Sequence, residues 1–142
     1  MAKLDMDGPL KLEEKIILKE IIQPMPGSFA LGHLGADRSF EVLYVSYADT
    51  TVQEALLKCL KKRIGQGGFM DKLAGKKKIN AFKYSFANSV EACYQKTCKN
   101  FHEFGGLKAL NNKEHPRPPK GSDWACSRCT EELTASFKIK AG

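Results

Sequence analysis

Two pairs of side chains in this sequence have the residue types and the spacing of metal ligands. Cys126 and Cys129 form a CxxC motif, and Cys98 and His102 lie four residues apart in a segment with a helical pattern. Residues four apart on a helix project from one face, so both could reach a single ion. Thiolates and imidazoles suit tetrahedral zinc, and four protein ligands leave no open coordination position. The sequence therefore predicts a structural Cys3His zinc site.

Other interpretations of these residues stay open. Cys98 could be a buried core cysteine, as free cysteines often are, with His102 an ordinary hydrogen-bonded side chain. His115 competes for the place of the fourth ligand. The CxxC could be a redox pair, but such pairs usually begin a helix in a βαβ unit, whereas this one follows a proline-rich loop. Cys59 and Cys93 have no partner at metal-ligand spacing, so we expect both in the core.

The elements that position these residues follow from hydrophobic periodicity and turn signals. Residues 10–22 have apolar side chains near helical spacing, although their β-branched residues leave a strand possible. A β-hairpin is expected from strands at residues 28–34 and 39–47, joined by a turn at residues 35–38. Residues 51–63 read as a helix, in which the first residue and Glu54 have capping-box spacing.

The second half of the chain is expected to add one strand and one long helix. Residues 64–80 look like a glycine-rich, lysine-rich loop, and residues 81–87 alternate as a third strand. The last long helix should begin at the cap Asn88 and run to about Phe104, where two glycines stop it. Residues 130–142 could hold a short helix or strand.

These elements predict one small α/β (α+β) domain. Its sheet should have three largely antiparallel strands flanked by helices, and the zinc site should tie the C-terminal loop to the last long helix. We divide the chain into an N-terminal helical or extended segment at residues 1–26, the domain at residues 27–130 and a C-terminal tail at residues 131–142. With 142 residues, 42% of them hydrophobic, the chain has enough apolar surface for one core.

The charge balance favours a polyanionic partner. The net charge is +7 and the pI is near 9.2, so nucleic acid comes first as a partner. Tyr47 and Phe69 could stack on bases, whereas the lysines could equally form a solvated face. No base-reading motif is present, so we expect weak sequence specificity. The basic residues expected to contact phosphates are Lys58, Lys61, Lys62, Arg63, Lys72, Lys76, Lys77 and Lys78.

Location is inferred from what the sequence lacks. No apolar run approaches the roughly 20 residues that span a bilayer, and acids occupy the N-terminal stretch where a signal peptide needs an apolar core. We therefore expect a cytoplasmic protein with no membrane partner and no small-molecule cofactor.

The chain also resembles the GIY-YIG nuclease superfamily over about residues 25–130. Residues 27–31, GSFAL, stand where the first motif begins its strand, and residues 43–46, LYVS, where the second motif ends the next strand. Residues 91–106, EACYQKTCKNFHEFGG, followed by LNNKEHPRPPKGSDWACSRC, look like a branch with a Cys and His on a helix and an HP…P…CxxC tail.

The resemblance implies a nuclease fold whose catalytic residues are mostly lost. Active members use two tyrosines, a helix arginine and a metal-binding glutamate. Here Tyr44 keeps the second tyrosine, but the first motif has Phe29. The arginine falls at or beside Ala55, near Gln53, and the glutamate falls at Thr97, which cannot replace a carboxylate at magnesium. Asn111 or Asn112 would match a late polar position.

Three functions are compatible with these observations. The first is a catalytically degenerate, zinc-containing domain that binds nucleic acid. The second is a protein-interaction subunit of a larger complex, built on an inherited scaffold. The third is a surviving enzyme, either a metal-dependent endonuclease with an altered site or a CxxC redox protein. We expect no nuclease activity of the GIY-YIG type.

Overall fold

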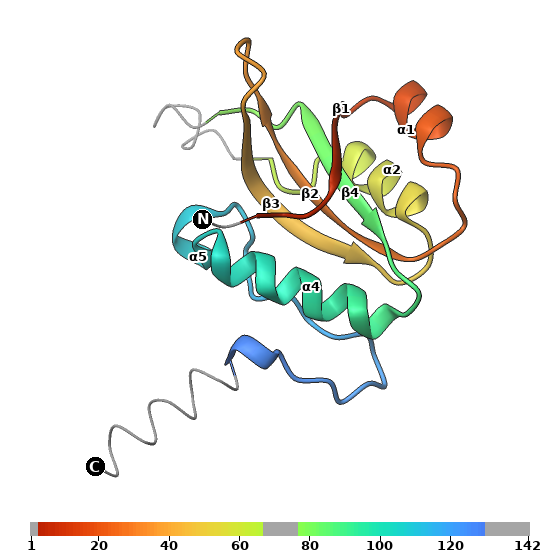
Figure 1. The fold of residues 1–142 in the computed structure, drawn as a ribbon, viewed down its shortest axis with the longest axis vertical. Coiled ribbons are helices and arrows are strands. Elements are labelled where there is room, and N and C mark those ends of the chain that lie inside the picture. Colours follow the sequence, from red (N-terminus) through yellow and green to blue (C-terminus); the bar gives the residue numbers. More distant parts are fainter. Residues whose placement is uncertain (1–2, 67–76, 130–142) are drawn as a thin grey trace.

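The computed structural model describes residues 3–66 and 77–129 (Figure 1). Within these ranges the chain forms an α+β fold with a single antiparallel sheet. In chain order the elements are β1 (Asp7–Lys11), α1 (Glu14–Glu20), β2 (Gly27–Leu34), β3 (Phe40–Ala48), α2 (Val52–Lys62), β4 (Ala81–Phe86), α4 (Val90–Glu103) and α5 (Gly106–Ala109). The sequence prediction for residues 130–142 lies outside the described residues.

The sheet has four strands in the order β1-β4-β2-β3, not the three that the sequence predicted. The added strand is β1, which pairs antiparallel with β4 through Leu10 opposite Phe82. Its sequence, DGPLK, gives almost no strand signal, because glycine and proline are depleted in strands. The strand lies at the edge of the sheet, where Pro9 does not interrupt a ladder on both sides.

The hairpin of β2 and β3 confirms the sequence prediction. The two strands pair from Gly27 opposite Ala48 to Leu34 opposite Phe40, and the turn closes with the Gly35 amide donating to the Ser39 carbonyl. Strand β2 also pairs with β4 and is therefore central in the sheet. A Cβ atom at Gly27 would lie 2.1 Å from the Ser85 carbonyl oxygen, so only glycine allows this close pairing.

The helices agree with the predictions in kind and differ at their ends. The predicted segment 10–22 divides into the end of β1 and helix α1, so both interpretations hold for part of it. Thr51 caps α2 by accepting from the Glu54 amide. Helix α4 is capped by Ser89, which accepts from the Ala92 amide, and not by Asn88 as predicted. Ser89 is the cap because its backbone has the extended conformation that an N-cap residue requires.

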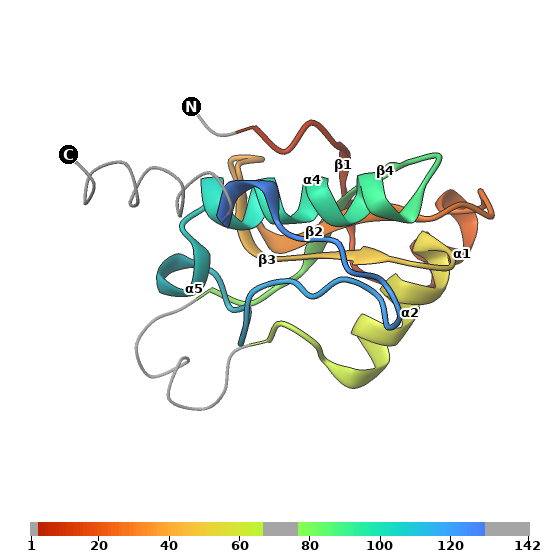
Figure 2. The same cartoon turned by 90° about the horizontal axis from the view of Figure 1, so that it is seen from below.

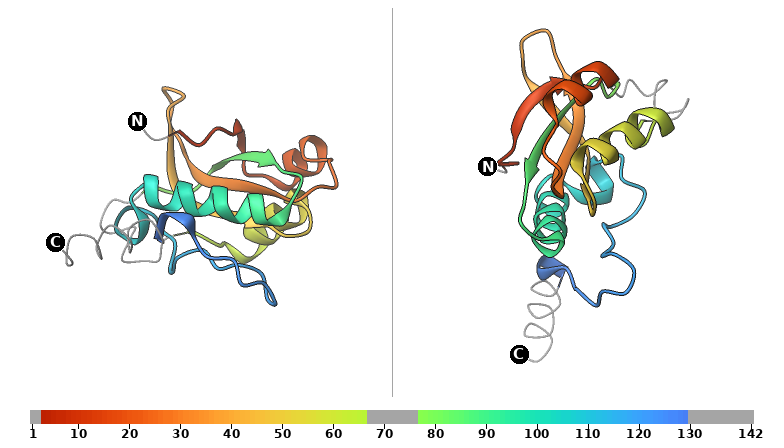
Figure 3. Two further views of the ribbon diagram at one scale, coloured as in Figure 1. Left: turned by 60° about the horizontal axis from the view of Figure 1, so that its bottom comes forward. Right: turned by 90° about the vertical axis from the view of Figure 1, so that its right-hand side faces the viewer.

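Helices cover both faces of the sheet (Figures 2 and 3). Phe29 and Leu31 of β2 point to one face, where they form the larger core cluster with residues of α1 and α2. Ala30 and Val45 point to the other face and pack with Phe101 of α4. The alternation along β2 thus buries both faces of the central strand, as expected for a strand between two layers.

After α5 the chain returns along the free edge of β3 and then along α4 (Figure 2). The side-chain amide of Asn112 accepts from the Val45 amide at 3.1 Å and donates to the Val45 carbonyl at 2.8 Å. The backbone N–H of Asn111 donates to the Leu43 carbonyl. These contacts satisfy backbone groups that an edge strand leaves unpaired, and they place the C-terminal loop beside the candidate site.

Candidate metal centre and adjoining cleft

Four side chains from distant parts of the sequence form a cluster that could hold a metal ion. They are His102, His115, Cys126 and Cys129, and their ligand atoms all lie within 4.8 Å of one another. The two histidine Nε2 atoms are 3.2 Å apart, and the Cys129 Sγ lies 3.3 Å from Nε2 of His102 and 3.4 Å from that of His115. We call these residues the four-donor cluster.

The cluster contains three of the four residues predicted from the sequence, together with His115. Cys98 is not in the group, and its assignment as a ligand stays a prediction. Its side chain is fully buried one turn before His102, where it contacts Tyr94 and Cys126. Burial raises the pKa of the Cys98 thiol to about 12, opposed by a hydrogen bond from Tyr94. His115 is the residue that the sequence offered as the competing ligand.

The histidine rings are oriented by their neighbours. Phe101 packs edge-on against both imidazoles, with ring centroids 5.5 Å from His102 and 5.0 Å from His115. The Nδ1 of His115 lies 2.7 Å from the Pro116 carbonyl oxygen. A neutral imidazole that donates from Nδ1 keeps the lone pair of Nε2 free, so this contact selects the tautomer that binds a metal.

Side chains of α4 hold the CxxC in place. The Gln95 amide donates to the Ala125 carbonyl at 2.8 Å and accepts from the Ser127 amide at 3.2 Å. Arg128, between the two cysteines, pairs with Glu103 at 2.6 Å. The sequence pattern predicted that the helix and the loop would meet. It did not predict the contacts of Gln95, because nothing in the sequence around Gln95 indicates a partner 30 residues away.

The other two cysteines lie in the core, as predicted. Cys59 of α2 packs in the larger cluster, and burial raises its pKa to about 11. Cys93 is fully buried, and its thiol donates to the Ser89 carbonyl at 3.3 Å. Burial also raises the pKa of Cys93. Neither thiol has the depressed pKa of a reactive cysteine.

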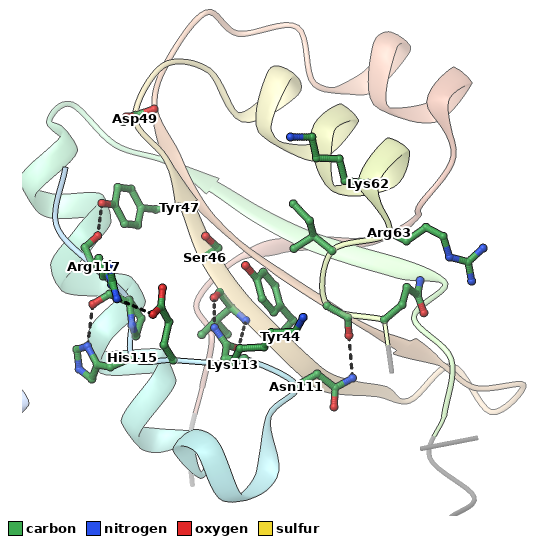
Figure 4. A pocket seen from close by; sticks show the side chains of 17 residues that line it. Tyr44, Ser46, Tyr47, Asp49, Lys62, Arg63, Asn111, Lys113, His115 and Arg117 are labelled. Atoms are coloured by element: carbon green, nitrogen blue, oxygen red, sulfur yellow. Dashed lines mark hydrogen bonds and ion pairs between the residues drawn. The ribbon is translucent and has the colours of Figure 1, made fainter. Parts of the chain in front are cut away.

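A cleft of about 780 Å³ adjoins the four-donor cluster (Figure 4). Its floor is the outer part of β3, one wall is the C-terminal end of α2 with the following turn, and the opposite wall is formed by residues 111–117, which we call the cleft wall. This volume lies within the roughly 300–1,000 Å³ of typical ligand sites. His115 belongs to both the cleft wall and the cluster.

Tyr44 lies on the floor of the cleft (Figure 4). Burial raises the pKa of its hydroxyl, so the phenol is neutral at physiological pH. The turn after α2 passes close to its ring, and Gly65, at φ +81°, would place a Cβ 3.0 Å from Tyr44. Tyr47 donates to the Arg117 carbonyl, so its hydroxyl is already used within the protein.

The lining of this cleft carries more positive than negative charge, with Lys62, Arg63, Lys113 and Arg117 against Asp49 and Glu114. Arg117 pairs with Glu114 at 2.9 Å, whereas Lys62, Arg63 and Lys113 form no ion pair with any residue in the described ranges. All three of these cations are exposed. Lys62 and Arg63 are among the basic residues predicted from the sequence. Lys113 is not, because it is a single lysine in a proline-rich loop that only folding brings to the cleft.

The remaining basic residues predicted to contact nucleic acid are dispersed. Lys58 and Lys61 are exposed on α2 but do not line this cleft. Lys77 pairs with Glu41 at 3.3 Å, and the Lys78 carbonyl lies 2.8 Å from His33. Predictions for Phe69, Lys72 and Lys76 lie outside the described residues.

The positions that the nuclease resemblance assigns to catalysis have structural contacts. Phe29 is buried in the core. Gln53 donates to the Ile21 carbonyl at 3.0 Å, and Ala55 packs against the core. Thr97 is fully buried, and its hydroxyl lies 3.1 Å from the Ser46 carbonyl and 2.9 Å from the Cys93 carbonyl. None of these four side chains brings a charge to the cleft.

Comparison with known proteins supplies no relative. No family model, curated protein or solved structure matches the chain. Among the described residues, no helix has the length and apolar character needed to cross a membrane. The function must therefore be argued from the cluster and the cleft themselves.

Proposed function

We propose that this protein is a zinc-stabilised, catalytically degenerate domain of the GIY-YIG type that binds nucleic acid through the cleft beside Tyr44. The observation that carries the proposal is the gathering of Lys62, Arg63 and Lys113 around a ligand-sized cleft without acidic partners among the described residues. Cations left unpaired in a concave site attract phosphate, and proteins neutralise nucleic-acid phosphates with such residues.

Zinc is the metal that best suits the four-donor cluster. Two thiolates and two imidazoles form a common structural zinc set, and tetrahedral bonds of about 2.0–2.3 Å place ligand atoms roughly 3.3–3.8 Å apart. The three separations among His102, His115 and Cys129, 3.2, 3.3 and 3.4 Å, are close to this range, and all four ligand atoms lie within 4.8 Å of one another. The ion would have four protein ligands, so its role would be to tie the C-terminal loop to α4 and not to bind substrate.

The order of elements supports a GIY-YIG type of fold. A hairpin, β2 and β3, is followed by α2, then by β4 and the long helix α4. Tyr44, the motif tyrosine that the resemblance retains, lies on the cleft floor. Strand β1 and the loop that follows α5 would be additions of this chain to that arrangement.

Loss of nuclease activity follows from the residues at the catalytic positions. A magnesium ion at the scissile phosphate needs hard, charged oxygen ligands, and Thr97 offers a hydroxyl whose contacts are to two carbonyl groups inside the protein. The helix position near Gln53 and Ala55 offers no cation. Binding without cleavage is therefore the activity that the cleft supports.

The proposal is tested by measuring binding of fluorescein-labelled DNA and RNA 20-mers by anisotropy between 50 and 200 mM salt. We expect binding that weakens steeply with salt. Lys62→Gln/Arg63→Gln/Lys113→Gln should weaken it at least about tenfold, by the loss of up to three phosphate contacts. Lys15→Gln/Lys19→Gln/Lys99→Gln changes the net charge equally at positions outside the cleft and serves as the matched control. Equal losses in both triple variants would reject the cleft as the binding site.

A protein-interaction subunit is the second candidate. Leu18 lies in α1 and Ile22 lies two residues after its end, and these two large apolar side chains are 48% and 72% exposed. Exposed apolar residues in a group favour contact with another chain. Two results together would favour this function over the first. The protein would bind no nucleic acid at any salt concentration, and a stable partner would co-purify with it from cells but not with the variant Leu18→Ser/Ile22→Ser.

A further inference from the structure

The cleft wall is shared between the two sites of this protein. Residues 111–117 form one side of the cleft, and His115 in their middle is also a member of the four-donor cluster. Two of the cations that line the cleft, Lys113 and Arg117, lie on either side of this histidine. The position of the wall therefore bears on metal binding and on ligand binding together.

The beginning of the wall is attached to the sheet without any metal. Asn112 makes two hydrogen bonds to the backbone of Val45, and the Asn111 side chain donates to the Gly65 carbonyl at 2.9 Å. These contacts bind the wall to the edge of β3 and to the turn after α2. They keep the first two residues in place whatever occupies the cluster.

The rest of the wall has few attachments. Among the described residues, those at 113–117 are joined to other parts of the fold by His115, which lies in the cluster and packs on Phe101, and by the Arg117 carbonyl, which accepts from the Tyr47 hydroxyl. The Glu114–Arg117 ion pair lies within the wall and is exposed, so it contributes little to fixing the segment. A metal ion bound by both His115 and His102 of α4 would be the strongest restraint on residues 113–117.

We propose that metal occupancy of the four-donor cluster sets the affinity of the cleft for phosphate-bearing ligands by holding residues 113–117 in place. The inference rests on the proposed function, since it takes nucleic acid as the ligand. With the ion bound, His115 is tied to His102 on α4, and Lys113 and Arg117 stay at the cleft. Without the ion only the packing of His115 on Phe101 holds the segment between Asn112 and the Tyr47–Arg117 hydrogen bond, and the ligand must order it at an entropic cost.

The coupling is reciprocal. If metal raises the affinity for nucleic acid by some factor, nucleic acid raises the affinity for metal by the same factor. Couplings of this kind usually lie at about 5- to 150-fold. The salt dependence gives a separate signature, because each phosphate contact contributes about 0.9 to the slope for duplex DNA. Removal of the metal should reduce the slope by about one, since Lys113 is the cation of the segment that is not paired, whereas Arg117 pairs with Glu114.

The first experiment compares the zinc-loaded full chain with the same protein after chelation, using a duplex DNA 20-mer. We expect the metal-free protein to bind at least about fivefold more weakly, with the shallower salt slope. Amide 15N order parameters of residues 113–115 and 117, measured without DNA, should fall on chelation, while those of β2 and β4 stay high. This measurement tests the structural half of the inference even if no nucleic acid binds.

The second experiment separates release of the wall from loss of the metal, and it carries the test if the metal-free protein does not stay folded. His115→Ala leaves His102, Cys126 and Cys129 as donors, so with excess zinc the ion stays bound while the wall is freed. We expect this variant to bind DNA as weakly as the chelated protein. Tyr47→Phe removes the other attachment and should enlarge the effect of chelation.

The outcomes separate the two proposals. If the zinc-loaded protein binds DNA and neither chelation nor His115→Ala changes its affinity or salt slope, the coupling is wrong and the proposed function stands. If the zinc-loaded protein binds no nucleic acid, the proposed function fails, and the coupling to nucleic acid fails with it. Unchanged order parameters of residues 113–115 and 117 on chelation contradict the coupling in either case.

Discussion

His102 and His115 face each other with their Nε2 atoms 3.2 Å apart, although 13 residues separate them in the sequence. One ring comes from the last turn of α4 and the other from the loop that follows α5. Two imidazole nitrogens with free lone pairs repel each other at this distance unless a proton or a metal ion lies between them. Either a proton shared in a hydrogen bond or a metal ion accounts for this separation, and the pair belongs to the cluster that could hold a metal ion and that adjoins the cleft.

We expect native protein to contain one zinc ion per chain by mass spectrometry. Replacement of zinc by cobalt should give the absorption of a tetrahedral site with two thiolates, since the cluster contains Cys126 and Cys129. His115→Ala should weaken zinc binding by at least about tenfold, and Cys98→Ser should weaken it less. A cobalt spectrum with three thiolates, reduced to two by Cys98→Ser, would instead make Cys98 the fourth ligand.

Asn112→Asp should destabilise the protein by about 2 kcal/mol, because it replaces the donor that faces the Val45 carbonyl with a second acceptor. The substitution keeps the size of the side chain, so packing is unchanged. The free energy of unfolding by urea is the measurement. Asn88→Asp, at an exposed position, is the matched control and should cost less than about 0.5 kcal/mol. Equal stability of the two variants would show that the contacts to Val45 do not hold this edge.

The buried thiol of Cys59 should make the fold less stable at alkaline pH. Its pKa is raised from 9.0 to about 11 by burial. Between these values the unfolded chain releases the proton and the folded chain keeps it, so stability is full below pH 9 and falls as the pH rises toward 11. The loss is at most roughly 3 kcal/mol from this group, because each of the two pKa units is worth about 1.4 kcal/mol. Urea unfolding of wild type and Cys59→Ala under reducing conditions should show a steeper decline for wild type, and parallel curves would contradict the assignment.

Incubation with plasmid or branched DNA and magnesium or manganese should give no cleavage. Thr97→Glu should not create activity either, because position 97 is fully buried against carbonyl groups, and an added carboxylate there lowers stability by several kcal/mol. A nicking assay and a thermal melt of the same preparation measure both effects. Robust cleavage that Tyr44→Phe abolishes would show that the catalytic site has survived in altered form.

Several secondary-structure elements of this protein could be predicted from local patterns in its sequence. The hairpin of β2 and β3, the capped helix α2 and the strand β4 follow from alternation, turn residues and capping residues that act within a few positions of one another. Three members of the four-donor cluster were found in the same way. His102 has a partner cysteine four residues before it, and Cys126 and Cys129 form a motif by themselves.

Contacts between residues that are distant in the sequence depend on the tertiary fold. Strand β1 forms because β4 offers an unpaired edge, and DGPLK contains no strand signal of its own. His115 joins the cluster because Asn111 and Asn112 attach the preceding chain to β3, so that the loop passes over α4. Lys113 reaches the cleft for the same reason. Such encounters depend on the path of the whole chain, and the spacing of residues within one segment does not encode them.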